Sequence, residues 1–140
     1  MRDTQAIVEA FTAAWAHPRV EKLVQLLHPD CLLLQPVTKP IRGREAACAE
    51  FTKLLGWLAD LRGTVDRSAV DADVALVAWR LHFTLGGAPC ELRIVDRLVV
   101  EDGLIREREA YYDSLALMIA VLRRPRAWAG YLRYRGYLPG

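Results

Sequence analysis

Glu91-Leu-Arg-Ile-Val-Asp-Arg-Leu-Val-Val-Glu-Asp-Gly-Leu-Ile-Arg-Glu-Arg-Glu-Ala-Tyr-Tyr-Asp113 is the stretch of sequence that decides the fold. Its two apolar-rich halves meet at Asp102-Gly103, a pair that readily takes the positive φ of a two-residue turn, so the stretch predicts a β-hairpin. Side chains alternate along a strand, and one face of the first half therefore carries Leu92, Ile94, Asp96, Leu98 and Val100. A buried, unpaired carboxylate is strongly unfavourable. We therefore expect Asp96 to be paired, solvated in a cavity or protonated.

Length and composition indicate one domain with an ordinary core. A chain of 140 residues can bury ~70% of its unfolded surface without disulfides or metals. Cys31, Cys48 and Cys90 lie far apart and lack C-x-x-C spacing, so we expect neither a disulfide framework nor a metal site. The N-terminus enters an amphipathic pattern directly, and no apolar run approaches membrane-spanning length. We therefore expect a cytoplasmic protein with reduced thiols.

The net charge of +2 is unevenly distributed along the chain. Residues 123–140 carry five arginines and no acidic residue. The first 122 residues hold the other 14 of the 19 basic residues and all 17 acidic ones, a net charge of −3. A body this close to neutral lacks the basic footprint of a nucleic-acid-binding protein. We expect no nucleic-acid partner.

Three helical patterns occupy the first half of the chain. The first should begin after an N-cap at Asp3 or Thr4 and end at His17-Pro18. The second covers about 19–27, and the third, expected to be the longest, covers about 44–61.

Short strands surround these helices and follow them. The pattern predicts strands at 31–35, 64–70 and 74–85, a loop at 37–43, and turns at 71–73 and 86–87. In the strand at 74–85, Trp79, Leu81 and Phe83 share one face, and Arg80 and His82 share the other. A last helix at 114–122, with Ser114 as N-cap, follows the hairpin. Helices first and antiparallel strands later predict an α+β fold, with helices on one face of a curled sheet.

The order of elements resembles that of the nuclear transport factor 2-like superfamily over about residues 4–120. The resemblance rests on Asp30-Cys-Leu-Leu-Leu-Gln-Pro36 leading through Ile41-Arg-Gly-Arg-Glu-Ala-Ala47 to a helix. The superfamily includes SnoaL-like polyketide cyclases, limonene-epoxide hydrolases and Δ5-3-ketosteroid isomerases. It implies a cone-shaped barrel in which a strongly bent antiparallel sheet, packed on N-terminal helices, leaves a deep apolar pocket. It also implies a homodimer. The domain would cover 1–122, with 123–140 as a basic aromatic tail.

The hairpin is most similar to that of the ketosteroid isomerases. The resemblance places their oxyanion-binding acid on Asp96, a role that a protonated aspartic acid can fill. Their oxyanion-hole tyrosine falls on Phe11 and their general base on Gln35. A phenyl ring offers no hydrogen bond, and an amide does not take a carbon-bound proton at neutral pH. Conventional steroid isomerisation is therefore not expected.

Two other chemistries of the superfamily match only in part. Limonene-epoxide hydrolases use an Arg-x-Asp pair and a further aspartate, which fall on Arg80-Leu-His82 and Asp113. His82 has a suitable pKa for a base, but strand parity turns Arg80 and His82 away from the pocket unless a bulge intervenes. The polyketide cyclases are expected to use an aspartate near the hairpin, for which both Asp96 and Asp113 qualify.

The leading hypothesis is a cofactor-free protein that encloses a small hydrophobic molecule. Asp96 would form the polar end of its pocket, with Tyr112 and Gln35 nearby, and would serve an isomerase or cyclase as acid or base. An inward arginine, Arg106 or Arg108, would instead keep Asp96 ionised. The apolar walls are expected from Phe11, Trp15, Leu27, Phe51, Trp79, Leu81, Leu92 and Ile94. The alternative is a non-catalytic ligand-binding or protein-interaction module.

The tail, residues 123–140, has two interpretations. Interrupted by Pro125, Gly130 and Gly136, it is expected to pack its aromatic side chains on the barrel or on a second subunit, with its arginines in water. The competing interpretation is a peripheral contact with a membrane surface or an acidic partner.

Overall fold

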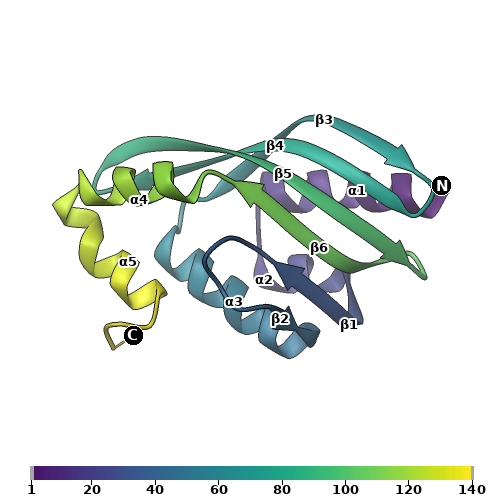
Figure 1. The fold of residues 1–140 in the computed structure, drawn as a ribbon, viewed down its shortest axis with the longest axis horizontal. Helices are drawn as coiled ribbons and strands as arrows, with labels where there is room; N and C mark the ends of the chain where they lie inside the picture. The colour runs from purple at the N-terminus through teal and green to yellow at the C-terminus, as the bar shows by residue number, and fades with distance from the viewer. Residues whose placement is uncertain (1, 140) are drawn as a thin grey trace.

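The computed structural model, which describes residues 2–139, is a curved sheet with helices on its concave side and at one end (Figure 1). The helices are α1 (Arg2–Ala16), α2 (Val20–Gln25), α3 (Gly43–Trp57), α4 (Ser114–Leu122) and α5 (Trp128–Tyr134), with a 3-10 turn η1 (Pro125–Ala127). The strands are β1 (Leu27–Leu34), β2 (Ile41–Arg42), β3 (Arg62–Asp71), β4 (Val74–Leu85), β5 (Ala88–Glu101) and β6 (Leu104–Tyr112). No helix within residues 2–139 is both long and apolar enough to cross a membrane.

The sheet has the strand order β2-β1-β6-β5-β4-β3. Neighbouring strands are antiparallel except for β1 and β6, which run parallel. The expected α+β fold, a strongly bent sheet packed on N-terminal helices, is confirmed. In Figure 1, β3 to β6 arch along the long axis, and α4 and α5 lie at the end opposite the N-terminus.

The β5–β6 hairpin forms as the sequence predicts. Asp102 and Gly103 both have positive φ, 54° and 73°, which is the turn geometry that matches the twist of two antiparallel strands. Alternate residues of β5 are buried from Ile94 to Val100, so the apolar stripe with Asp96 at its centre faces the core. Likewise β4 buries Trp79, Leu81 and Phe83 and turns Arg80 and His82 outward.

Several predicted boundaries in the first half of the chain are wrong. Helix α1 already begins at Arg2, and Thr4 lies inside it, where its hydroxyl donates to the Ala72 carbonyl oxygen at 2.8 Å. Strand β1 starts at Leu27 and includes Pro29, because a register shift between Leu27 and Leu32 tolerates the missing N–H.

The loop and the helix that follow β1 also differ from the prediction. Residues 41–42, assigned to a loop, pair with β1 as β2. Helix α3 ends at Trp57 and has the same length as α1, 15 residues. It stops because Leu58 leaves the helical region at φ −113° and ψ 78°, which turns the chain toward β3.

Helix α4 has the predicted range but a different N-cap. The carboxylate of Asp113, rather than the hydroxyl of Ser114, accepts a hydrogen bond from the Ala116 N–H at 2.9 Å. Asp113 is thereby engaged in capping.

Candidate functional site

A cavity of about 90 Å³ lies between the concave face of the sheet and helices α3, α4 and α5. It has room for several water molecules, each of which needs ~10–15 Å³ by this measure. Its walls are mostly apolar and come from every layer of the fold; they include Trp15, Leu33, Phe51, Leu54, Trp57, Leu58, Leu81, Phe83, Leu92 and Ile94. Its polar side chains are those of Gln35, Thr38, Glu50, Arg108, Tyr112, Ser114, Tyr131, Tyr134 and Arg135. Such a cavity is typical of sites for small apolar molecules that carry one or two polar groups.

Arg108 on β6 is one of the charged residues that line the cavity. The Arg108 side chain is only 12% exposed, and its Nε donates to Asp96 Oδ2 at 3.1 Å. Three aromatic rings surround it, with the Arg108 Cζ 5.3 to 5.9 Å from the ring centroids of Phe11, Trp15 and Trp79. These contacts hold the guanidinium by charge pairing and by cation–π attraction. We call this group, Arg108 with Asp96 and the three rings, the arginine cage.

The cage leaves part of the guanidinium available. Within residues 2–139, neither Nη atom of Arg108 has a hydrogen-bond partner, and neither is among the fully buried polar atoms. Arg108 lines the cavity, so its free N–H groups are candidates for contact with a molecule inside it. They form a planar fork suited to a carboxylate or an enolate oxygen.

Asp96 lies behind Arg108 and not at the cavity surface, so its expected place at the polar end of the pocket is corrected. It is 0% exposed, and Trp79 Nε1 donates to its Oδ2 at 3.0 Å. Its Oδ1 has no partner within the described residues. Burial raises the pKa of Asp96, and Arg108 offsets part of that effect. In this arrangement Asp96 holds Arg108 in place and is not itself part of the cavity wall.

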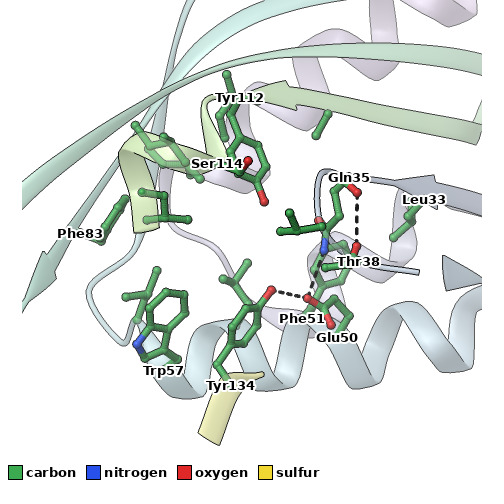
Figure 2. A pocket seen from close by; sticks show the side chains of 18 of the residues that line it. Leu33, Gln35, Thr38, Glu50, Phe51, Trp57, Phe83, Tyr112, Ser114 and Tyr134 are labelled. Atoms are coloured by element: carbon green, nitrogen blue, oxygen red, sulfur yellow. Dashed lines mark hydrogen bonds between the residues drawn. The ribbon is translucent and has the colours of Figure 1, made fainter. Parts of the chain in front are cut away.

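A second polar group centres on Glu50 of α3. Glu50 Oε1 accepts hydrogen bonds from Gln35 Nε2 at 3.3 Å and from the Tyr134 hydroxyl, and Lys53 Nζ lies 4.0 Å from Glu50 Oε2. Figure 2 shows Gln35 and Tyr134 converging on Glu50 from either side. Burial, with Glu50 nearby, raises the pKa of Tyr134 well above its usual range. We call Gln35, Glu50 and Tyr134 the glutamate cluster.

Tyr112 also lines the cavity, and its hydroxyl points into it (Figure 2). Burial raises the pKa of Tyr112; the charge of Arg108 lowers it and that of Glu50 raises it. Among the described residues no hydrogen bond joins Tyr112 to Asp96, because Tyr112 pairs with Ile94 while Asp96 lies opposite Ala110. Its hydroxyl is therefore available to a ligand.

The structure sorts the other predicted site residues into two sets. Those that line the cavity are Trp15, Gln35, Phe51, Leu81, Leu92, Ile94 and Tyr112. Phe11, Leu27 and Trp79 are buried behind the wall instead, with Phe11 and Trp79 in the arginine cage.

The residues matched to epoxide hydrolases lie outside the cavity. Arg80 forms ion pairs with Asp66 and Glu91 on the outer face of the sheet. His82 shares that face, and Asp113 caps α4. The partial match to an epoxide-hydrolase site therefore does not form in this fold.

Several cavity residues were not among the predicted site residues: Glu50, Trp57, Tyr134 and Arg135, together with Arg108, which was considered only as a partner for Asp96. Glu50 and Trp57 stand three and ten positions after the buried Ala47, on the edge of the apolar stripe of α3. Because such spacings place residues beside the buried face of a helix, they could have indicated that Glu50 and Trp57 line the cavity. Tyr134 and Arg135 gave none, because α5 is short and follows a proline-containing turn.

One group of potential metal ligands lies away from the cavity. His28, Glu101 and Asp102 gather at the β5–β6 turn, with ligand atoms within 4.8 Å of one another. Solvent-exposed acidic groups of this kind are common without an ion, and we assign none to it.

Comparisons with known proteins identify a family model that matches the sequence and solved structures with a similar fold. Residues 8–108 match the model of the SnoaL-like domain. A proposed SnoaL-like polyketide cyclase from Jannaschia sp. CCS1 is 19% identical, with a TM-score of 0.75 over 86% of this chain and 92% of that one. TerC, crystallised with polyporic acid, is 17% identical, with a TM-score of 0.76 over 85% and 98% of the two chains.

A further structural neighbour is an enzyme of a different reaction class. An LEH-like epoxide hydrolase from M. tuberculosis is 19% identical, with a TM-score of 0.73 over 91% of this chain and 96% of that one. The comparison with curated protein sequences finds no match. At these identities the structural likenesses establish the fold, whereas the sequence match over most of the chain establishes the family. The chain belongs to the SnoaL-like domain family, within the nuclear transport factor 2-like superfamily.

Proposed function

We propose that this protein binds a small, largely apolar molecule and orients it by an oxygen that carries or develops negative charge. The observation that carries the proposal is the arginine cage: a guanidinium held by Asp96 and three aromatic rings, on a residue that lines an apolar cavity and whose Nη atoms have no hydrogen-bond partner among residues 2–139. A preorganised cation in a site of low polarity favours an oxyanion more strongly than the same cation in water.

The same cavity supports acid–base chemistry without a cofactor. Glu50 would take a proton from the carbon next to a carbonyl, and the electron pair left behind would move to the carbonyl oxygen, held as an enolate by Arg108. The Tyr112 hydroxyl would donate a hydrogen bond to the same oxygen or to a second one. Return of the proton to another carbon gives isomerisation, and attack of the enolate carbon on a second carbonyl gives cyclisation.

The structural neighbours agree with the proposed ligand class. One of them was crystallised with polyporic acid and another is a proposed polyketide cyclase. Both descriptions refer to oxygen-bearing molecules or to enzymes acting on them. The epoxide-hydrolase alternative has less support, because Arg80 and His82 face away from the cavity.

The test is carbon-bound hydrogen exchange in D₂O with 2-tetralone, an enolisable bicyclic ketone, followed by NMR. We expect the wild-type protein to accelerate deuterium uptake. We expect Glu50→Gln, and the double variant Asp96→Asn/Arg108→Gln that leaves no buried charge unpaired, each to reduce the rate by about 10²-fold or more. Glu107→Gln is the matched control, since Glu107 pairs with Arg97 outside the cavity. Equal exchange in the wild-type and Glu50→Gln proteins would contradict the assignment of the base.

A non-catalytic binding protein is the second candidate, and one observation favours it. Glu50 Oε1 already accepts two hydrogen bonds, which weakens that oxygen as a base. A binding protein would show a ligand-dependent rise in melting temperature that depends on Arg108, without deuterium uptake by any enolisable ketone. A ligand at ~100 times its dissociation constant adds ~2.7 kcal/mol to the free energy of unfolding, which is readily measured.

A further inference from the structure

Helix α4 has two apolar sides, and only one of them is covered. Its sequence, Ser114 to Leu122, contains no charged residue. Leu117 and Met118 line the cavity and Val121 is buried. The other side presents Leu115, 67% exposed, and Leu122, 60% exposed, with Ile119 between them. Positions i, i+4 and i+7 form one continuous stripe on a helix.

Arginines border this stripe. Arg123 and Arg124 line a shallow hollow beside Ile119, and Arg126 follows in η1. Trp128, which is also exposed, begins α5 next to them and anchors its indole N–H to the Val121 carbonyl oxygen at 3.0 Å. We call Leu115, Ile119, Leu122 and Trp128, with the flanking Arg123, Arg124 and Arg126, the α4 ridge. Figure 1 shows α4 and α5 together at one end of the molecule.

The charge around the ridge has no internal counterpart. Residues 114–139 contain five arginines and no acidic residue. Within residues 2–139, none of these five arginines forms an ion pair. An apolar stripe with an exposed tryptophan and a border of arginines is the combination that binds at the surface of an anionic bilayer.

We propose that the α4 ridge docks on anionic lipid membranes. The apolar side chains would enter the interfacial region while the arginines contact lipid phosphates and carboxylates, each arginine adding roughly fivefold to the affinity. A second copy of the chain is a poorer occupant. In a two-fold dimer the same patch meets itself, so this contact would place two arginine-bordered surfaces together without acidic partners. An anionic surface neutralises them instead.

Docking in this orientation places a cavity wall next to the bilayer, because Leu117, which lines the cavity, lies on the side of the same helix opposite to Leu115 and Ile119. Exchange of an apolar ligand between bilayer and cavity would follow, and this consequence rests on the proposed function. Membrane docking itself does not, and the experiment below measures docking without any ligand.

The test is co-sedimentation of the full chain with vesicles of phosphatidylcholine alone or with 30% phosphatidylserine. The ridge variant is Leu115→Asn with Leu122→Asn. Its matched control is Leu76→Asn with Val95→Asn, two exposed apolar residues on the outer face of the sheet. Thermal melts establish that both double variants remain folded, which their exposure favours. We expect binding to the phosphatidylserine vesicles at least tenfold tighter than to phosphatidylcholine alone. The ridge variant should bind the phosphatidylserine vesicles at least tenfold more weakly than the wild-type protein, and the control variant less than twofold more weakly.

Three outcomes would overturn the proposal. One is the absence of preference for phosphatidylserine. Another is an equal loss of binding in the ridge and control variants. The last is a concentration-dependent dimer, detected by light scattering, that the ridge variant dissociates; a second copy would then be the occupant. A loss of binding at 0.5 M salt in the wild-type protein would support the role of the arginines.

Discussion

The two polar groups of the cavity are built in different ways. The arginine cage lies within the β-sheet body, where the charges are buried, paired and surrounded by aromatic rings. The glutamate cluster joins α3 to α5, and its carboxylate is 16% exposed. The cage lies inside the stretch that matches the family, residues 8–108, whereas Tyr134 lies beyond it. The cage is thus held by residues of the matched stretch, whereas the glutamate cluster depends on a residue of the C-terminal segment, and we expect the cage to be the more tightly held of the two.

The largest expected effect comes from removing the cation of the cage. Arg108→Met leaves the Asp96 carboxylate buried without its partner, which typically destabilises a protein by about 3–5 kcal/mol. Asp96→Asn keeps an acceptor for Trp79 and Arg108, and we expect it to change stability by about 1 kcal/mol or less. The double variant Asp96→Asn/Arg108→Met should recover most of the free energy of unfolding that Arg108→Met loses, because no charge is then left unpaired. Urea unfolding of all four proteins gives the coupling energy. Additive losses would show that Asp96 and Arg108 do not act as a unit.

Gly63 tests how tightly the rings of the cage are packed. A Cβ built at Gly63 would lie 2.6 Å from Trp79 Cζ3 and 3.2 Å from Trp15 Cβ. We expect Gly63→Ala to destabilise the fold by ~1–3 kcal/mol through overpacking. Gly56→Ala is the control, because no atom lies within 4 Å of its Cβ and alanine is favoured over glycine in α3 by ~1 kcal/mol. The two variants should therefore shift the melting temperature in opposite directions. A neutral Gly63→Ala would contradict the tight packing of the cage.

The glutamate cluster should respond more weakly. Tyr134→Phe removes the hydroxyl that donates to Glu50 but keeps the ring, which stacks on Trp57 with centroids 4.8 Å apart. We expect a loss of about 1 kcal/mol. Tyr137→Phe, at an exposed side chain, should leave the free energy of unfolding unchanged. A loss above ~3 kcal/mol in Tyr134→Phe would show that this end is as rigid as the cage.

The pH dependence of stability separates the ionised and neutral forms of Asp96. Burial raises the pKa of Asp96 in the folded protein above its ordinary value of 3.8, so the folded state holds this proton more tightly than the unfolded state. The wild-type protein therefore loses stability as pH rises from about 4 through the folded pKa. Asn does not titrate, so the free energy of unfolding of wild type minus that of Asp96→Asn should decrease over that range and then level off. An increase would mean that Arg108 outweighs burial and lowers the pKa.

The sequence predicted the sheet more reliably than the site, for physical reasons. Alternation along β4 and β5 and the Asp102-Gly103 turn are local signals, and they placed Asp96 and Trp79 in the core. Whether Asp96 faces the cavity depends on which side chain lies between its carboxylate and the cavity. That side chain is Arg108, which β6 brings there through a register shift between Val99 and Val100 of β5. The glutamate cluster joins residues 84 positions apart in the chain. No local pattern reports such a contact.

The most direct test of the account is ligand discrimination at Arg108. Titration calorimetry would compare 2-naphthoate with 2-naphthamide, which differ in charge but hardly in shape. We expect the wild-type and Asp96→Asn proteins to bind the carboxylate at least tenfold tighter than the amide, because a charge-assisted hydrogen bond contributes ~1.5–3 kcal/mol. The Asp96→Asn/Arg108→Gln protein, which leaves no buried charge unpaired, should bind both with similar affinity. Equal affinities in the wild-type protein, or a preference that survives the loss of Arg108, would contradict the proposed oxyanion site.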